Sequence, residues 1–149
     1  MKITILAVGK LKEEYLKKAA ARFSKEISRH CGFSLIEIPD ESNENRSPKT
    51  VKETEGEGIL KRIRPEQYVI ALAIDGKYKT SEEFRSFLRK QGSGDRNDLV
   101  FVIGGSLGLS PEVLQRANEK LSFSPMTFPH QLMRIMLMEQ VVAALKGDW

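Results

Sequence analysis

One short region of the chain holds residues whose types and spacing could do chemistry. The segment LSFSPMTFPH (121–130) ends in His130, and an apolar, helix-like segment follows it. Arg134 lies one helical turn after His130, on the same face of that helix. Glu139 is an isolated carboxylate farther along. Imidazole and carboxylate side chains can act as general bases, and a guanidinium can stabilise a developing anion. These three residues are therefore the candidate catalytic groups.

Each candidate also has a structural interpretation. His130 could be a helix-start residue with a satisfied hydrogen bond. Arg134 could bind a phosphate, or it could pair with Glu139 across a subunit two-fold axis. The methionines of the same segment, Met133, Met136 and Met138, are more typical of packing than of a cofactor site.

A second region, FVIGGSLGLSPEVL (101–114), has an apolar run that leads into glycines. The spacing of GGSLG (104–108) lacks the dinucleotide fingerprint and the Lys-Ser/Thr of a phosphate loop. Glycine at the carboxyl end of a parallel strand still allows a ligand to approach the backbone closely. Backbone amides and carbonyls with apolar walls would suit an adenine ring. The alternative is a tight turn without a ligand.

The elements that must position these residues can be predicted from periodicity. Four apolar runs are predicted strands: 2–8, 33–39, 68–74 and 99–103, the third ended by a turn at Asp75-Gly76. Helices are expected at 11–30, 51–63, from Ser81, from Pro111 to about Lys120, and at 130–145. Strands without polar alternation, separated by helices, indicate a mostly parallel sheet with helices on both faces. We therefore expect a single α/β domain over residues 1–149.

Two further segments carry expectations of their own. DESNENRSPKT (40–50) has no apolar residue, and we expect a mobile loop there, either a solvated connector or a loop that orders on substrate. The helix at 130–145 is apolar on nearly every side and must be buried on more than one. Because the sheet already has helices to cover it, a homodimer through this helix is expected.

Composition limits the class of protein. The 149 residues include one cysteine and two histidines, so we expect neither a disulfide within the chain nor a structural metal site. No apolar run reaches the ~18–20 residues that span a bilayer, and the start lacks the pattern of a secretory signal. A cytoplasmic protein without membrane contact is the expectation. The net charge of +4 suits a polyanionic partner and equally a simple solubility role.

Several of these stretches together resemble one family. KITILAVGK, ALAIDGK, FVIGGSLGLSPEVL and above all LSFSPMTFPHQLMRIMLMEQ are similar to the ribosomal RNA large subunit methyltransferase H family, of the SPOUT class. The resemblance runs from residue 1 to about residue 146. It implies a C-terminal trefoil knot, a homodimer and S-adenosylmethionine as methyl donor. It also implies N3 methylation of a pseudouridine of the position-1915 class in 23S rRNA of the assembled ribosome.

The resemblance also implies a cofactor pocket. By position it falls on Leu72 at the end of the third strand, on Gly104 after the fourth, and on the segment Phe123, Ser124, Pro125, Met126, Thr127 and Phe128. These are strand ends and an irregular, proline-containing segment with free backbone groups. Loss of the weakly acidic N3 proton of pseudouridine requires a base or a stabilising cation, the roles assigned here to His130, Arg134 and Glu139.

The chain departs from the family near its C-terminal end. Family members carry a Tyr-Arg pair where this chain has Val142 and Ala143, and then a tail rich in Tyr, His and basic residues. This chain stops at Lys146-Gly147-Asp148-Trp149. Two alternatives therefore stay open beside the methyltransferase: a weakened or inactive homologue that binds RNA or the ribosome, and a SPOUT methyltransferase with another RNA target.

Overall fold

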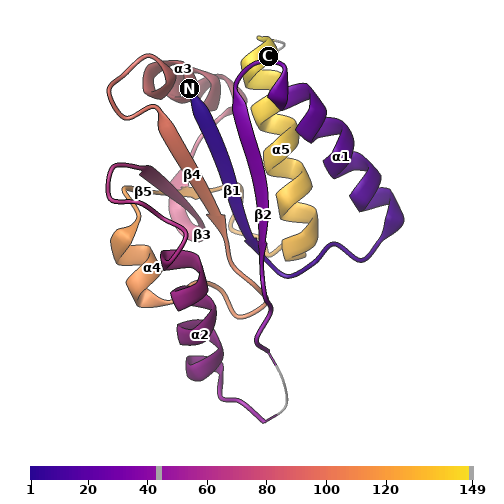
Figure 1. Ribbon diagram of the computed structural model, residues 1–149, viewed down its shortest axis with the longest axis vertical. Helices are drawn as coiled ribbons and strands as arrows, with labels where there is room; N and C mark the ends of the chain where they lie inside the picture. Colours follow the sequence, from indigo (N-terminus) through magenta and orange to yellow (C-terminus); the bar gives the residue numbers. More distant parts are fainter. Residues whose placement is uncertain (43–44, 148–149) are drawn as a thin grey trace.

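The computed structural model describes residues 1–42 and 45–147 as ten elements around one sheet (Figure 1). The strands are β1 (Lys2–Val8), β2 (Gly32–Ile38), β3 (Tyr68–Tyr78), β4 (Asp98–Ile103) and β5 (Glu119–Ser122). The helices are α1 (Glu14–Ser28), α2 (Pro48–Leu60), α3 (Ser81–Gly92), α4 (Pro111–Arg116) and α5 (His130–Lys146). The sheet order is β2-β1-β4-β3-β5, and all four strand pairs are parallel. The predicted α/β class with a parallel sheet is confirmed.

The strands at the centre of the sheet are the most apolar. In β1 every residue after Lys2 is buried, and in β4 every residue after Asp98 is buried. Such strands are covered on both faces, which explains why their sequences lack the polar alternation of a half-exposed strand.

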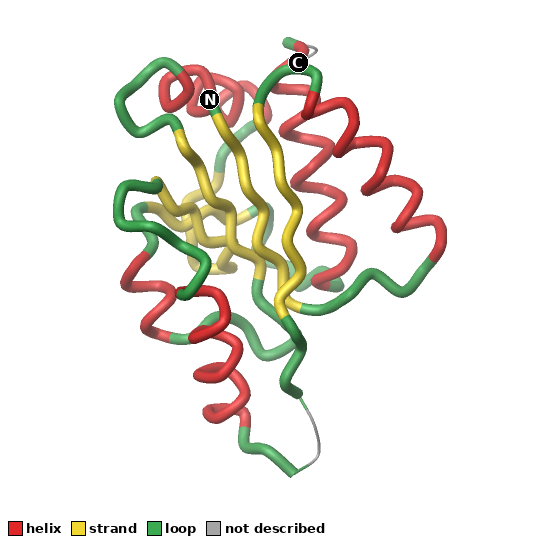
Figure 2. The backbone as a smooth tube through the Cα atoms, in the orientation of Figure 1, coloured by secondary structure: helices red, strands yellow, loops and turns green. Residues whose placement is uncertain are grey.

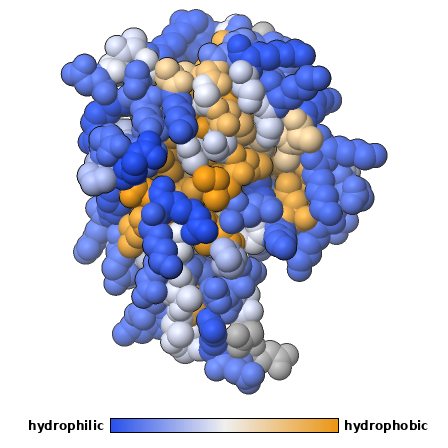
Figure 3. All heavy atoms as spheres, viewed as in Figure 1, coloured by the Kyte–Doolittle hydropathy of each residue, from blue (hydrophilic) through white to orange (hydrophobic). Residues whose placement is uncertain are grey.

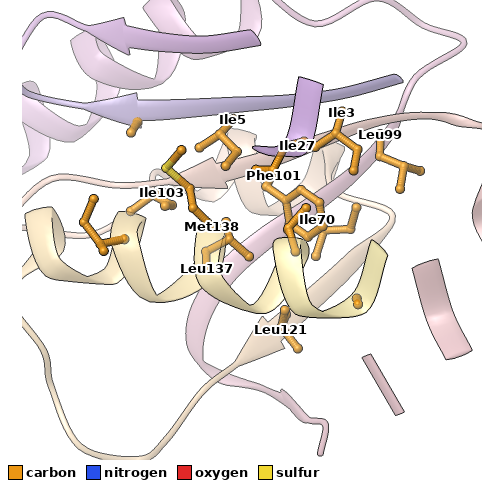
Figure 4. Close-up of a cluster of buried hydrophobic side chains, with 14 of the residues drawn as sticks. Ile3, Ile5, Ile27, Ile70, Leu99, Phe101, Ile103, Leu121, Leu137 and Met138 are labelled. Carbon is orange, nitrogen blue, oxygen red and sulfur yellow. The ribbon is translucent and has the colours of Figure 1, made fainter. Parts of the chain in front are cut away.

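Two hydrophobic clusters cover the two faces of the sheet. The larger joins alternate residues of β1, β3 and β4 to helices α1, α3 and α5, with Phe101, Leu137 and Met138 near its middle (Figure 4). The smaller joins the intervening strand residues to α2 and α4 through Ile59 and Val113. Helices therefore lie on both faces, as predicted, and α5 packs between α1 and α3.

Helices α2 and α4 cover their face incompletely. Partly buried residues such as Ile36, Leu60 and Ile63 pack against the smaller cluster. Apolar atoms reach the surface in the middle of the view in Figure 3, with hydrophilic atoms around them. This apolar area is therefore a partly open edge of the core.

Two element boundaries differ from the sequence predictions. Helix α4 ends at Arg116, and Ala117 turns to an extended conformation, so the prediction of a helix to about Lys120 is wrong. Residues Glu119–Ser122 instead form β5, which pairs with β3. The strand was missed because EKLS (119–122) has two charges in four residues and only Leu121 and Ser122 are buried.

The predicted turn at Asp75-Gly76 is also wrong, because β3 continues to Tyr78. Leu72 and Lys77 both pair with Leu121, so the residues between them form a bulge. A Cβ added at Gly76 would lie 2.8 Å from the backbone nitrogen of Leu121. The glycine that suggested a turn is thus required for close approach of two strands.

The loop predicted at 40–50 is shorter in the structure. Helix α2 begins at Pro48, and the hydroxyl of Ser47 accepts a hydrogen bond from the amide of Thr50 as its N-cap. Residues 43–44 lie outside the described part of the chain. Within residues 1–42 and 45–147, none of the helices is long and apolar enough to span a membrane.

Candidate functional site

A pocket lies where the carboxyl ends of parallel strands meet the start of α5. The loops that leave β1, β2 and β4 gather at one edge of the sheet (Figure 2). The volume of this pocket is about 150 Å³, below the usual range for small-molecule sites, and the pocket opens to solvent. The pocket is lined by the end of β3, the glycine loop after β4, the segment after β5 and the first turn of α5: Leu72, Ala73, Ile74, Ile103, Gly104, Gly105, Gly108, Leu109, Leu121, Ser122, Phe123, Ser124, Met126, Thr127, Phe128, His130 and Met133.

Most residues of the predicted cofactor set lie together in this pocket. Leu72, Gly104 and five of the six residues of 123–128 line it, and Pro125 does not. The segments are separated by about twenty to fifty residues of sequence, and the parallel sheet brings their ends to one edge. Their assignment to a cofactor remains a prediction.

The glycine loop forms one wall. The amide of Gly108 donates to the carbonyl of Gly105 at 3.0 Å, which closes the loop. A Cβ added at Gly104 would lie 2.9 Å from the carbonyl carbon of Gly108. Gly108 itself has a φ of 86°, a conformation that favours glycine. The wall is therefore backbone, which can offer directed hydrogen bonds to a ligand.

The segment after β5 forms the opposite wall. The hydroxyl of Ser122 donates to the carbonyl of Ser124 at 3.1 Å, and the hydroxyl of Ser124 accepts from the amide of Met126 at 3.0 Å. These local bonds replace a strand ladder in a stretch with two prolines. Met126 is 70% exposed at the mouth.

His130, the first residue of α5, also lines the pocket. A Cβ added at Gly9 would lie 3.8 Å from Nε2 of His130. Gly9 follows β1 with a φ of 93°, so the chain turns sharply there and leaves space for the imidazole. The candidate base is thus the one catalytic candidate that borders the pocket.

Arg134 does not reach the pocket. Its side chain is 1% exposed, and its Nη1 donates to Oε2 of Glu37 at 2.7 Å. Its Nη2 donates to the carbonyl of Gly9 at 3.0 Å, while Nε has no partner within the described residues. In this chain Arg134 ties α5 to the ends of β1 and β2. It pairs with Glu37, and neither a phosphate nor Glu139 has access to the buried guanidinium.

Glu139 lies on an exposed position of α5 beside a second cavity. That cavity shares Phe123 and Phe128 with the first, so the two are separated by the segment after β5. The structure therefore brings His130 to the pocket and places Arg134 and Glu139 elsewhere.

A pair of carboxyl groups lies beside the glycine loop. Burial raises the pKa of Glu55, and a hydrogen bond and the charge of Asp40 add to this effect. Hydrogen bonds from Ser42 lower the pKa of Asp40, and His130 lowers it further through its charge. A Cβ added at Gly105 would lie 3.3 Å from Oε1 of Glu55. The carboxyl of Glu55 thus lies against the glycine loop, and Glu55 is not among the residues that line the pocket.

Sequence reasoning missed Glu37 and Glu55. Glu37 is the one charged residue of β2, near its end, and a charge in a mostly apolar strand is a usable signal for an ion pair. Glu55 had no comparable signal, because α2 carries several glutamates and only the fold shows which one is buried. Among the described residues, no cluster of three or more metal-binding side chains is present.

The structure describes some of the positions at which the chain departs from the expected family pattern. Val142 packs against the larger core cluster, and Ala143 is buried. Residues 148–149 lie outside the described part of the chain.

Comparison with known proteins agrees with the fold. The family model described as "Predicted SPOUT methyltransferase" matches residues 1–146. Proteins named ribosomal RNA large subunit methyltransferase H are similar along nearly the whole chain. The one from Ligilactobacillus salivarius is 53% identical over 95% of this chain and 91% of its own length. The protein from Bacillus pumilus is 51% identical over 98% of this chain and 94% of its own length. The protein from Clostridium kluyveri is 50% identical over 99% of this chain and 98% of its own length.

A solved structure shares the fold. A probable methyltransferase from Bordetella pertussis Tohama I superposes with a TM-score of 0.58 at 12% identity, over 97% of this chain and 94% of the other. The family match over 146 residues and the relatives at half identity establish that the chain belongs to the SPOUT methyltransferase family.

Proposed function

We propose that this protein transfers a methyl group from S-adenosylmethionine to N3 of a pseudouridine in 23S rRNA, at a site of the position-1915 class. The observation that carries the proposal is the pocket itself. Its walls are the glycine loop and the segment after β5, and His130 borders it. The relatives named as large subunit rRNA methyltransferases support the RNA substrate.

The pocket suits the adenosine part of the donor. An adenine ring needs apolar walls and a few directed hydrogen bonds. Leu72, Leu109 and Phe123 supply apolar surface, and the Gly104–Gly108 loop supplies backbone groups. The bound donor would supply an activated methyl group for in-line displacement, and much of the rate would come from alignment with the acceptor.

His130 is the residue we assign to the proton. The N3–H of pseudouridine must be lost as the N–C bond forms, and a base within hydrogen-bond reach of the acceptor would accept it. His130 is held beside Gly9 at the pocket. Arg134 would act indirectly, because its bonds to Glu37 and Gly9 fix the turn of α5 that carries His130.

A homodimer is part of the proposal. Most apolar residues of α5 are buried within the chain, but Leu132 of α5 is 37% exposed. Ile74 and Met126, which border the pocket, are 54% and 70% exposed. A second copy that covers this apolar mouth would exclude water from the reacting groups.

Two alternatives make different predictions. A non-catalytic homologue would bind RNA or the ribosome without using a methyl donor. A methyltransferase with another RNA target would bind the donor but leave the 23S pseudouridine unmodified.

Donor binding is tested by titration calorimetry of the full chain with S-adenosylmethionine. We expect saturable heat and an increase in Tm with donor concentration. Absence of both would contradict the assignment of the pocket and leave the non-catalytic alternative.

The pocket assignment is tested by Thr127→Trp. Thr127 is exposed and lines the pocket, so an indole at this position would fill part of the space that we assign to the donor. We expect at least a tenfold loss of donor affinity, while the free energy of unfolding changes by no more than about 0.5 kcal/mol. Ser93→Trp, on an exposed residue after α3, is the matched control. Equal donor affinity in the two variants would refute the assignment.

A further inference from the structure

Helix α1 carries exposed cations in a regular row. Lys18, Arg22 and Lys25 are exposed and spaced four and three residues apart. With 3.6 residues per turn, they fall within an arc of about 60° on one side of the helix. We call these three residues the basic stripe. The buried face of α1, with Leu16 and Ile27, packs against α5 and the sheet instead.

Within the described residues, the basic stripe has no ion-pair partner. The neighbouring cations differ: Lys17 pairs with Glu14 at 3.5 Å, and Arg29 pairs with Glu26 at 3.1 Å. Arg22 lies over the ring of Phe23, 5.1 Å from its centroid, and keeps its charge toward solvent. Like charges at these spacings destabilise a helix, so the row is better explained by an anionic partner than by the stability of α1.

The basic stripe runs along α1, and the N-terminal end of α1 lies near the proposed reaction site. Before α1, the amide of Lys12 donates to the side chain of Gln131 at 3.2 Å, and Gln131 follows His130. Tyr15, which is 69% exposed, extends the row by one turn toward that end. In Figure 1, α1 and α5 run side by side from this edge of the sheet. A polyanion that enters the pocket at His130 could therefore continue along α1.

We propose that the basic stripe binds the phosphate backbone of the substrate RNA beside the modified nucleotide. This inference rests on the proposed function and adds the surface that orients the RNA. Lysine and arginine contacts to phosphate dominate the affinity of proteins for nucleic acid and fix its register. An exposed tyrosine at the end of the row offers a face on which an unpaired base can stack.

The test compares two triple variants of the full chain that each remove three positive charges. K18Q/R22Q/K25Q removes the stripe, and K49Q/K52Q/K61Q removes three lysines in and just after α2, on the opposite face of the sheet. Binding to 70S ribosomes that lack the modification, and to protein-free 23S rRNA, is measured between 50 and 200 mM KCl.

We expect the stripe variant to reduce the slope of log Kd against log[KCl] by about 2, because each phosphate contact contributes about 0.7 to 0.9. Its KM for ribosomes should rise while its affinity for S-adenosylmethionine stays the same. The α2 variant should keep the slope of the unsubstituted protein. Equal slopes for the two variants would overturn the inference.

Three other outcomes are also decisive. If the stripe variant lost binding to ribosomes but not to protein-free rRNA, the stripe would contact an acidic protein, contrary to the inference. A lower sedimentation mass of this variant alone would place the stripe in a subunit interface and overturn it as well. Absence of methylation by the unsubstituted protein, with the difference in slope retained, would contradict the proposed function and support the RNA-binding surface.

Discussion

At the scale of single residues, Arg134 is a catalytic candidate that the structure holds in an ion pair away from the pocket lining. Its guanidinium is buried between Glu37 and the carbonyl of Gly9. The sequence spacing predicted that Arg134 lies one helical turn after His130 on the same face of a helix, and both residues lie in α5. The spacing could not show that β2 supplies an acidic partner from nearly a hundred residues earlier.

Loss of the ion pair between buried Arg134 and Glu37, whose side chain is 38% exposed, should destabilise the protein. Arg134→Ala empties a buried position and leaves the carbonyl of Gly9 without this donor, while Glu37 still accepts from the amide of Leu11. We expect the free energy of unfolding to fall by about 2 kcal/mol. Urea denaturation measures the change. Arg22→Ala, on the exposed face of α1, is the control and should change it by no more than about 0.5 kcal/mol. A similar value for both variants would show that the Arg134–Glu37 pair contributes nothing to stability.

The raised pKa of Glu55 predicts that the stability of the protein depends on pH. Its pKa is raised above 4.5 by burial and by Asp40, so the folded state binds more protons than the unfolded state between the two pKa values. Stability from this group is therefore present at low pH and is lost as pH rises through the folded pKa. Gln at this position stays neutral and can still accept from the amide of Glu41, which Glu55 does at 3.1 Å.

We therefore expect Glu55→Gln to gain stability relative to the unsubstituted protein as pH rises from about 4 to about 7. Thermal unfolding at several pH values, followed by circular dichroism, measures the difference in Tm. A difference that is constant with pH would contradict the raised pKa. Glu57→Gln, at an exposed position of the same helix, provides the comparison.

At the scale of elements, the long apolar segments were the most predictable. β1 and β4 are buried on both sides, so their sequences alone carry the signal of a central parallel strand. β5 and the bulge in β3 depend on each other, since Leu121 pairs with both Leu72 and Lys77. That pairing joins segments some fifty residues apart, and local propensity contains no information about it.

Gly76 should be the least tolerant residue of this bulge. A Cβ there would lie 2.8 Å from the backbone of β5, and backbone must move to accept it. We expect Gly76→Ala to cost about 2 kcal/mol of unfolding free energy. In Gly94→Ala the nearest atom is 3.4 Å away, which is an ordinary contact, so little change is expected. Equal Tm values for the two variants would argue against the tight strand packing.

The sequence indicated which segments form the pocket, but it did not indicate which residues pack against those segments. The glycine loop could be identified because it follows an apolar run at a strand end, where parallel sheets bind ligands. LSFSPMTFPH was assigned to the pocket by the family resemblance, because the strand β5 before it was not predicted. The residues that lie against these segments, Gly9 beside His130 and Glu55 beside Gly105, come from elsewhere in the chain and required the fold. The trefoil knot implied by the family resemblance stays a prediction.

At the scale of the whole molecule, the homodimer is tested by sedimentation equilibrium. An apolar α5 and the exposed apolar residues at the pocket favour a second copy. We expect a species of twice the 16.9 kDa of one chain. A single-chain mass at micromolar concentration would contradict the dimer and with it the covered pocket mouth.

The most direct test of the central claim is mass spectrometry of nucleosides from 23S rRNA. Ribosomes that lack the modification are incubated with the full chain and S-adenosylmethionine, and the rRNA is then digested. The account predicts one N3-methylated pseudouridine per 23S rRNA, lost when the protein carries Thr127→Trp and kept when it carries Ser93→Trp. Donor binding in the absence of any methylated pseudouridine would contradict it.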